Sequence, residues 1–201
     1  LCGIGARGFA WALDRAKSVA SGVRPVVRVP IAGAALCAAA LVSAWLFGDD
    51  LALGSGYRTL AWVTQPNHAL PLIGALFALR LVATTATVAG GGVGGLFIPL
   101  VIAGALLGDG LATVVHDQTT LFPLIGVAAF LGAGYRTPLA GVMFVAEVTG
   151  RPGFVVPGLI ASVASQLVMG DVSVSKYQAA GRGGVLEQRF GMPITAALRT
   201  D

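Results

Sequence analysis

Residues 90–108 read GGGVGGLFIPLVIAGALLG, a cluster of glycines followed by an apolar run without a charged residue. The start of a helix presents free N–H groups and the positive end of the helix dipole, which suits an anion, and preceding glycines let the backbone approach that anion closely. The spacing Gly90-x-Gly92-x-x-Gly95 also satisfies the dinucleotide-binding pattern, with Asp109 downstream as its candidate ribose-binding acid. The stretch therefore indicates an anion site, in either a soluble nucleotide enzyme or a membrane protein.

Composition separates these two possibilities. The 201 residues are 56% hydrophobic and 11% charged, and the mean hydropathy is +0.83, whereas soluble domains carry about 25% charged residues. Residues 96–107 have no charged or strongly polar side chain on any face, although a soluble α/β helix would have a wet side. The sequence predicts a multi-pass protein of the lipid bilayer, and the anion is expected to be small and inorganic. The net charge of +4 does not indicate a nucleic-acid surface.

Uncharged stretches mark the expected membrane segments. Residues 29–48 are long enough to cross about 30 Å of hydrocarbon as a helix, and further uncharged runs cover residues 81–108, 118–135 and 152–170. Residues 1–22 have a helical period but carry charges, which predicts a tilted helix. Glycine and proline interrupt these runs, a pattern typical of transporters that bind solute near the bilayer midplane. The expected fold is all-α, with short, tilted and broken helices.

Charges predict the topology. Basic residues within 15–28 and after residue 175 should face the cytoplasm. Four aspartates are expected to mark loops without a positive bias: Asp49, Asp50, Asp109 and Asp117. Composition turns polar near the end, so we expect a membrane domain over residues 1–178 and a cytoplasmic tail over residues 179–201.

Four motifs resemble one known family. GGLFIP, residues 94–99, resembles the GxFxP signature of the CLC family of chloride channels and chloride/proton antiporters. The other three motifs, in the family's order, are FALRLVATT at 77–85, LGAGYRTPLAGVMFVAEVTG at 131–150 and SVSKYQ at 173–178. The resemblance implies chloride transport across a bacterial plasma (inner) membrane, as a voltage-gated channel or an antiporter.

The same resemblance implies an assembly. The family is a homodimer with one pore per subunit, and each subunit consists of two halves of inverted topology. This chain would be the second half, with the N-terminal half of the same polypeptide as its partner. Helices at 138–149 and 157–170 would line the subunit interface, and the tail would lead toward CBS domains.

The resemblance also implies an ion site. The N–H groups of Leu96 and Phe97 and the hydroxyl of Tyr177 would bind chloride, and a helix-break loop would be formed by Gly94, Gly95 and Pro99. The family's gating glutamate and serine loop belong to the absent first half, and Ser55 is not counted as a ligand. No cofactor is implied beyond chloride as the bound and transported ion.

Three charged residues lie in or near apolar stretches. A charge in the membrane is expensive unless it is paired or faces water, and for Arg80 and Glu147 we favour structural pairing inside the bundle over contact with the ion. Arg136 stands beside a helix break and is expected to be a structural anchor.

Catalysis and metal binding have little support. Ser/His/Asp spacing is absent, so no enzyme is expected, and His68 and His116 lack a nearby third ligand for a metal. Cys2 and Cys37 are expected to be packing residues. Tryptophans prefer the membrane–water interface, which is the expected place of Trp45 and Trp62.

Two alternatives remain open. The chain could be a truncated membrane fragment or scaffold without transport activity, or it could belong to a fluoride-exporting branch of the family. The choice between channel and proton-coupled antiporter depends on acidic residues outside this chain.

Overall fold

The structure is a computed structural model that describes residues 1–65, 68–116 and 120–174. The described residues form helices and no strand, which confirms the expected all-α class. In chain order the helices are α1 (Cys2–Ser21), α2 (Pro25–Phe47), α3 (Tyr57–Val63), α4 (Leu70–Gly90), α5 (Phe97–Val115), α6 (Leu121–Tyr135), α7 (Pro138–Thr149), η1 (Pro152–Phe154) and α8 (Val155–Met169).

Four helical segments are long and apolar enough to cross a membrane. They are Pro25–Phe47, Leu70–Gly90, Phe97–Val115 and Pro152–Met169, and the shorter helices α6 and α7 are also apolar. The long run at 81–108 is divided between α4 and α5, as its glycines predict.

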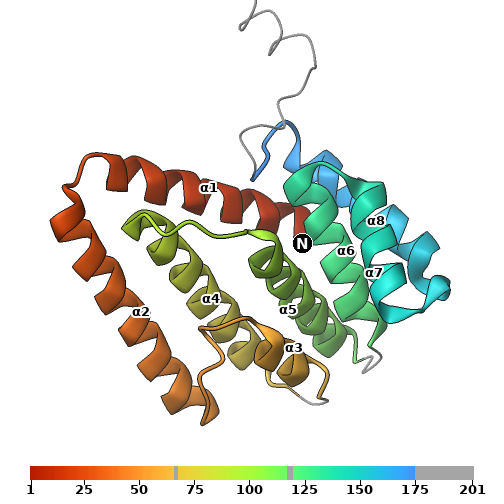
Figure 1. Cartoon of the computed structure of the whole chain (residues 1–201). Coiled ribbons are helices and arrows are strands. Elements are labelled where there is room, and N and C mark those ends of the chain that lie inside the picture. Colours follow the sequence, from red (N-terminus) through yellow and green to blue (C-terminus); the bar gives the residue numbers. More distant parts are fainter. Residues whose placement is uncertain (66–67, 117–119, 175–201) are drawn as a thin grey trace, which may run out of the picture.

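The helices lie around α5. Figure 1 shows α1 crossing above α4 and α5, with α3 near the opposite ends of these helices. Helix α5 packs against α4 on one side and α6 on the other, and α6 in turn contacts α7 and α8. Helix α2 has α4 as its main neighbour, so it lies at the edge of the bundle.

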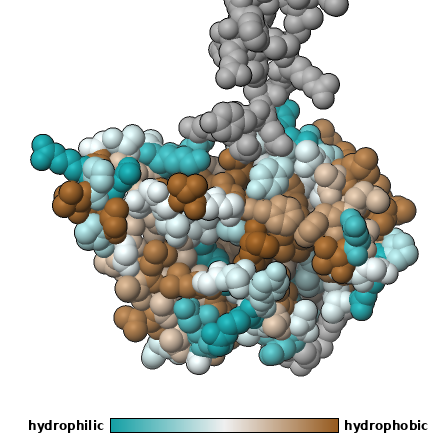
Figure 2. Space-filling view, in the orientation of Figure 1, coloured by the Kyte–Doolittle hydropathy of each residue, from teal (hydrophilic) through white to brown (hydrophobic). Residues whose placement is uncertain are grey.

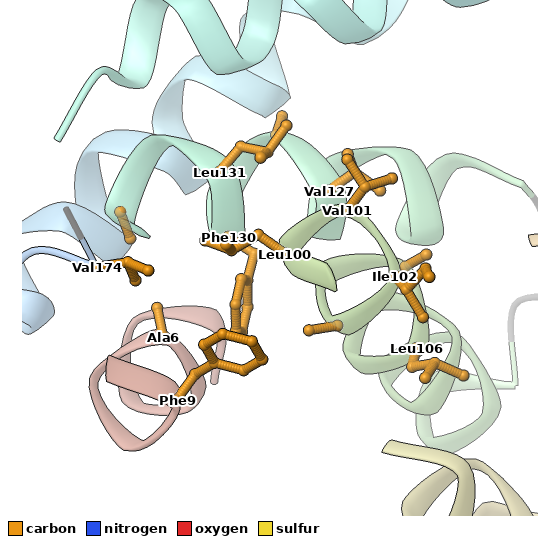
Figure 3. Close-up of a cluster of buried hydrophobic side chains, with 14 of the residues drawn as sticks. Ala6, Phe9, Leu100, Val101, Ile102, Leu106, Val127, Phe130, Leu131 and Val174 are labelled. Carbon is orange, nitrogen blue, oxygen red and sulfur yellow. The ribbon is translucent and has the colours of Figure 1, made fainter. Parts of the chain in front are cut away.

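A buried cluster fixes the beginning of α5. Leu100, in the first turn of this helix, has no exposed surface, and Ile102 is 1% exposed. In Figure 3 the ring of Phe9 from α1 lies against Phe130 from α6, and the ring centroids are 6.0 Å apart in an edge-on arrangement. The start of α5 is therefore held by side chains from two other helices.

Backbone contact joins α5 to α6. A methyl group at Gly104 would lie 2.6 Å from the carbonyl oxygen of Gly126, and one at Gly126 would overlap the carbonyl oxygen of Gly104. Gly108 lies equally close to the backbone of Phe122. Gly104 and Gly108 are four residues apart, the small-residue spacing that lets membrane helices approach closely.

The surface is apolar over a wide band. In Figure 2 hydrophilic residues gather along the upper and lower borders of the visible face, and hydrophobic residues occupy much of the area between them. Exposed apolar side chains include Leu41 at 72%, Trp45 at 84% and Leu167 at 78%. Apolar exposure of this extent is typical of contact with lipid or partner subunits, and the chain is a membrane protein.

Two expectations about single residues are wrong. Asp109 does not mark a loop, because it lies inside α5, where its Oδ2 is 3.1 Å from the Nδ1 of His68. This partner allows an aspartate within an apolar helix. Cys37 is exposed on α2 and so is not a packing residue in this structure, while Cys2 is half-buried.

Candidate anion site

The glycine stretch ends one helix and leads to the next. Gly91 caps α4 with a φ of 91°, in the left-handed region that favours glycine. A methyl group there would also lie 2.8 Å from a guanidinium nitrogen of Arg28. The chain then continues without helical structure until α5 begins at Phe97. The predicted helix break is confirmed.

The start of α5 is uncapped. Leu96 is its N-cap residue, and no side chain hydrogen-bonds to this end. The first N–H groups of a helix have no acceptor within the helix, and Pro99 occupies the third helical position, where its missing N–H costs nothing. The N–H groups of Leu96, Phe97 and Ile98 donate no hydrogen bond within the described residues, so they are free to bind a ligand. The ring of Phe97 packs edge-on against Phe144 of α7, with centroids 4.8 Å apart, which steadies this end.

Open space lies beside the uncapped end. A methyl group at Gly94 or Gly95 would meet no atom within 4 Å, and neither residue has a positive φ. A cavity of about 190 Å³ is lined by Gly94, Gly95 and Leu96 together with residues of α4 that include Thr84 and Thr87. These threonines lie in the C-terminal part of α4 and not beyond its end, so the start of α5 lies beside α4.

A second cavity adjoins the first. It measures about 420 Å³ and extends to Ser55 and Tyr57, at the start of α3. Both cavities share five residues: Gly54, Arg80, Thr84, Gly95 and Pro99. The two cavities together connect the α3 region with the uncapped start of α5.

Structural pairing inside the bundle is expected for Arg80. It has no carboxylate partner within ion-pair distance among the described residues. Its Nη2 donates to the hydroxyl of Thr59 at 2.5 Å, and its Nη1 donates to the carbonyl of Gly54 at 3.4 Å. Its Nε is buried and has no partner. Arg80 is thus anchored by neutral groups, and the carboxylate of Asp50 is close enough to act on its charge.

Glu147 and Arg136 differ in their contacts with the rest of the described structure. Glu147 lies exposed on α7, and no ion pair within the described ranges includes it. Arg136 ends α6 with a φ of 57°, and its Nη1 donates to the carbonyl of Asp171 at 3.2 Å. Arg136 therefore anchors the segment that follows α8. The same segment is held by Val174, whose N–H donates to the carbonyl of Gly134 at 2.9 Å.

Other expected residues lie apart from these cavities or outside the described part of the chain. His68 stacks on Trp62 with centroids 3.6 Å apart, so Trp62 has a packing partner that sequence reasoning missed. The searched residues contain no group of three metal-ligating side chains. Tyr177, Asp117 and the tail over residues 179–201 lie outside the described residues.

The comparisons with known proteins decide the family. A family model described as "Voltage gated chloride channel" matches residues 1–170. The chain belongs to this family, the CLC family. The H(+)/Cl(-) exchange transporters ClcA of Salmonella typhi and Salmonella typhimurium are each 29% identical over 127 residues, which is 60% of this chain and 27% of theirs.

A solved structure shares the fold. It is titled "X-ray crystal structure of a slow cyanobacterial Cl-/H+ antiporter", and the match has a TM-score of 0.69 at 18% identity. The match covers 98% of this CLC chain and 44% of the antiporter chain. This CLC chain therefore spans less than half the length of the relatives it matches.

Proposed function

We propose that this chain forms half of a chloride pathway, in which the N–H groups of Leu96 and Phe97 bind the ion. The observation that carries this proposal is the uncapped start of α5 beside a cavity partway along α4. Backbone N–H groups there meet an anion with the positive end of a helix dipole.

Neutral donors suit transport because they bind an anion without trapping it. The peptide groups at the start of α5 are such donors, and the hydroxyl of Tyr177 would be another. Within a membrane, irregular backbone such as residues 91–96 is tolerated where it lines a cavity, which supports placing the ion at this loop.

The complete site requires partners. We infer that an N-terminal half of the same polypeptide covers the cavities, and that a second copy of the subunit packs against α7 and α8. Large apolar side chains are exposed on these helices, among them Leu139 at 61%, Ile160 at 68% and Leu167 at 78%. Residues 1–178 would then form the membrane domain in a plasma membrane, and residues 179–201 its cytoplasmic tail.

The test uses the full-length protein with its first half. Phe97→Pro removes one N–H group at the first helical position, and Tyr177→Ala removes the hydroxyl. Both changes are expected to weaken chloride binding measured by isothermal titration calorimetry. Phe97→Ala is the matched control for the first variant, because it removes the ring and keeps the N–H group. An unchanged isotherm for both Phe97→Pro and Tyr177→Ala would rule this site out.

Flux measurements separate the related functions. Proteoliposomes with a chloride gradient should release chloride, and pH recorded at the same time distinguishes an antiporter from a channel. A preference for fluoride over chloride would identify a fluoride exporter. Absence of any anion flux from folded full-length protein would favour a scaffold without transport activity.

A further inference from the structure

The corner where α1 meets α2 is strongly basic. Four basic residues lie within residues 15–28, namely Arg15, Lys17, Arg24 and Arg28. Residues 1–48 contain a single acidic residue, Asp14, so four positive charges stand against one negative charge at this corner. In Figure 2 hydrophilic residues gather at the upper left, over the place where α1 meets α2 in Figure 1. The corner therefore carries a net positive charge.

The other acidic residues of the described chain lie elsewhere in the fold. Asp49 and Asp50 follow the opposite end of α2, and Asp109 lies in the second half of α5, paired with His68. The end of α4, which packs against α2, belongs to a stretch over residues 81–108 without a charged residue. The remaining two, on the α6 side of the bundle, are Glu147 on α7 and Asp171 after α8.

Arg28 lies between the start of α2 and the end of α4. A methyl group at Gly91, the cap of α4, would lie 2.8 Å from the Nη2 of Arg28. The two helices are close here, because a methyl group at Gly90 would lie 2.8 Å from the Cβ of Ala32 on α2. The C-terminal end of a helix carries a partial negative charge, which favours a guanidinium at this place.

The hydrogen-bonding capacity of this guanidinium is not used up by the protein. The Nε of Arg28 is buried and has no hydrogen-bond partner among the described residues. No ion pair within the described ranges includes Arg28 or Arg24. These two arginines are four residues apart, a spacing that places side chains on the same side of a helix. Together they can bind one anionic group.

Apolar side chains adjoin the two arginines along α2. Val26, Val29 and Ile31 are each more than half exposed. Helix α2 is a candidate membrane span that begins at Pro25, and a spanning helix begins at the level of the lipid headgroups. The corner thus offers guanidinium groups to a phosphate and apolar side chains to the acyl chains of the same molecule.

We propose that the corner between α1 and α2, together with the end of α4, binds the headgroup of an anionic phospholipid. Arg24 and Arg28 bind the phosphate, because guanidinium groups form paired hydrogen bonds with phosphate oxygens. Arg15 and Lys17 attract the negative headgroup. Basic pockets between membrane helices on the cytoplasmic side bind such headgroups, and an excess of Lys and Arg marks that side. The inference does not depend on chloride transport.

A bound lipid would fasten the edge of the bundle. Helix α2 has α4 as its main neighbour, and Arg28 connects the first turn of α2 with Gly91 at the end of α4. A phosphate held at this point adds contacts between the two helices beside residues 91–96, which lead to α5. We therefore expect the lipid to stabilise the folded protein.

The experiment measures lipid binding to full-length protein in neutral detergent micelles by native mass spectrometry. Dioleoylphosphatidylglycerol is the anionic probe, and dioleoylphosphatidylcholine is the reference with the same acyl chains and no net charge. Each basic residue near the headgroups raises the affinity for an anionic lipid by about fivefold. Arg24→Gln and Arg28→Gln should each weaken phosphatidylglycerol binding by about fivefold and the double variant by about 25-fold. Phosphatidylcholine binding should change much less.

Further measurements distinguish binding from a structural role. Arg7→Gln is the matched control, since Arg7 is an exposed basic residue of α1 outside residues 15–28, and this variant should bind phosphatidylglycerol as the wild type does. Arg28→Lys should keep most of the affinity because it keeps the charge. Phosphatidylglycerol should raise the unfolding temperature of the wild type more than that of the double variant, because the wild type binds more of it.

The possible outcomes separate this site from its alternatives. Equal affinities of the wild type for the two lipids, or wild-type affinity for phosphatidylglycerol in the double variant, would overturn the proposal. Equally tight binding of glycerol 3-phosphate, which has no acyl chains, would assign the corner to a free phosphate instead. Phosphatidylglycerol binding only after removal of residues 179–201 would assign it to the tail.

Two results bear on the design of the test. If Arg28→Gln does not fold, Arg24→Gln carries the test, because Arg24 is exposed before the first turn of α2 and its replacement should leave the fold intact. Absence of chloride flux from protein that binds phosphatidylglycerol would refute the proposed function and support this site.

Discussion

Gly104→Ala tests whether direct backbone contact between α5 and α6 holds the anion site in place. The added methyl carbon would lie 2.6 Å from the carbonyl oxygen of Gly126 and 2.8 Å from the Cα of Val127. Ordinary contact between non-bonded heavy atoms needs about 3.5 Å. Both neighbours belong to the backbone of α6 and cannot rotate away, so the two helices must separate by on the order of 1 Å.

The energetic cost follows from this overlap. Overpacking of one methyl group costs about 1–3 kcal/mol, and the preference of a helix for alanine over glycine returns about 0.5–1 kcal/mol. Gly104→Ala should therefore lower the free energy of unfolding by about 0–2.5 kcal/mol. It should also weaken chloride binding, because the displaced helix carries the N–H group of Phe97 and follows directly on that of Leu96.

Gly74→Ala is the matched control. Gly74 also lies inside a membrane helix, α4, but a methyl group there would meet no atom within 4 Å. This variant should raise the free energy of unfolding by about 0.5–1 kcal/mol and leave chloride binding unchanged. Unfolding of purified full-length protein in mixed detergent micelles measures the first quantity, and calorimetry measures the second. Equal stabilities for the two variants would refute the close contact between α5 and α6.

Three further substitutions test other parts of the structure. Phe130→Ala should lower the free energy of unfolding by about 3–5 kcal/mol, since its ring is fully buried against Phe9; a loss below 1 kcal/mol in the same detergent assay would contradict this packing. Asp109→Leu should lower the free energy of unfolding by about 1–3 kcal/mol because it leaves the imidazole of His68 without its partner. The double variant Asp109→Leu/His68→Leu should recover most of that loss, which a double-mutant cycle would measure. Gly91→Ala should lower stability by roughly 1–2 kcal/mol through its left-handed backbone, and wild-type stability for this variant would argue against that cap.

Much of the fold was predictable because glycine, proline and the absence of charge act locally. The break between α4 and α5 follows from residues 90–95, since glycines end one helix and Pro99 fits only the first turn of the next. The start of α7 at Pro138 follows from the same rule. These signals are independent of tertiary contacts, so the sequence contains them in full.

The remaining features depend on contacts between residues far apart in the chain. Asp109 was expected to mark a loop because a carboxylate in an apolar run usually ends a membrane segment. Its partner, His68, lies 41 residues away in the sequence, and no local pattern joins the two. Arg80 was likewise expected to be paired within the bundle. Its partners, a carbonyl and a hydroxyl near α3, could not be identified before the loop over residues 48–56 was placed.

The uncapped start of α5 has a consequence for how the sequence of such a protein can evolve. Peptide hydrogens are common to nearly every amino acid, so most single replacements at positions 96 and 97 keep the donors intact, and a systematic alanine survey would pass over them. Changes in ion preference must then come from the side chains that line the neighbouring cavities. The N–H donors themselves are kept as long as the backbone conformation is kept.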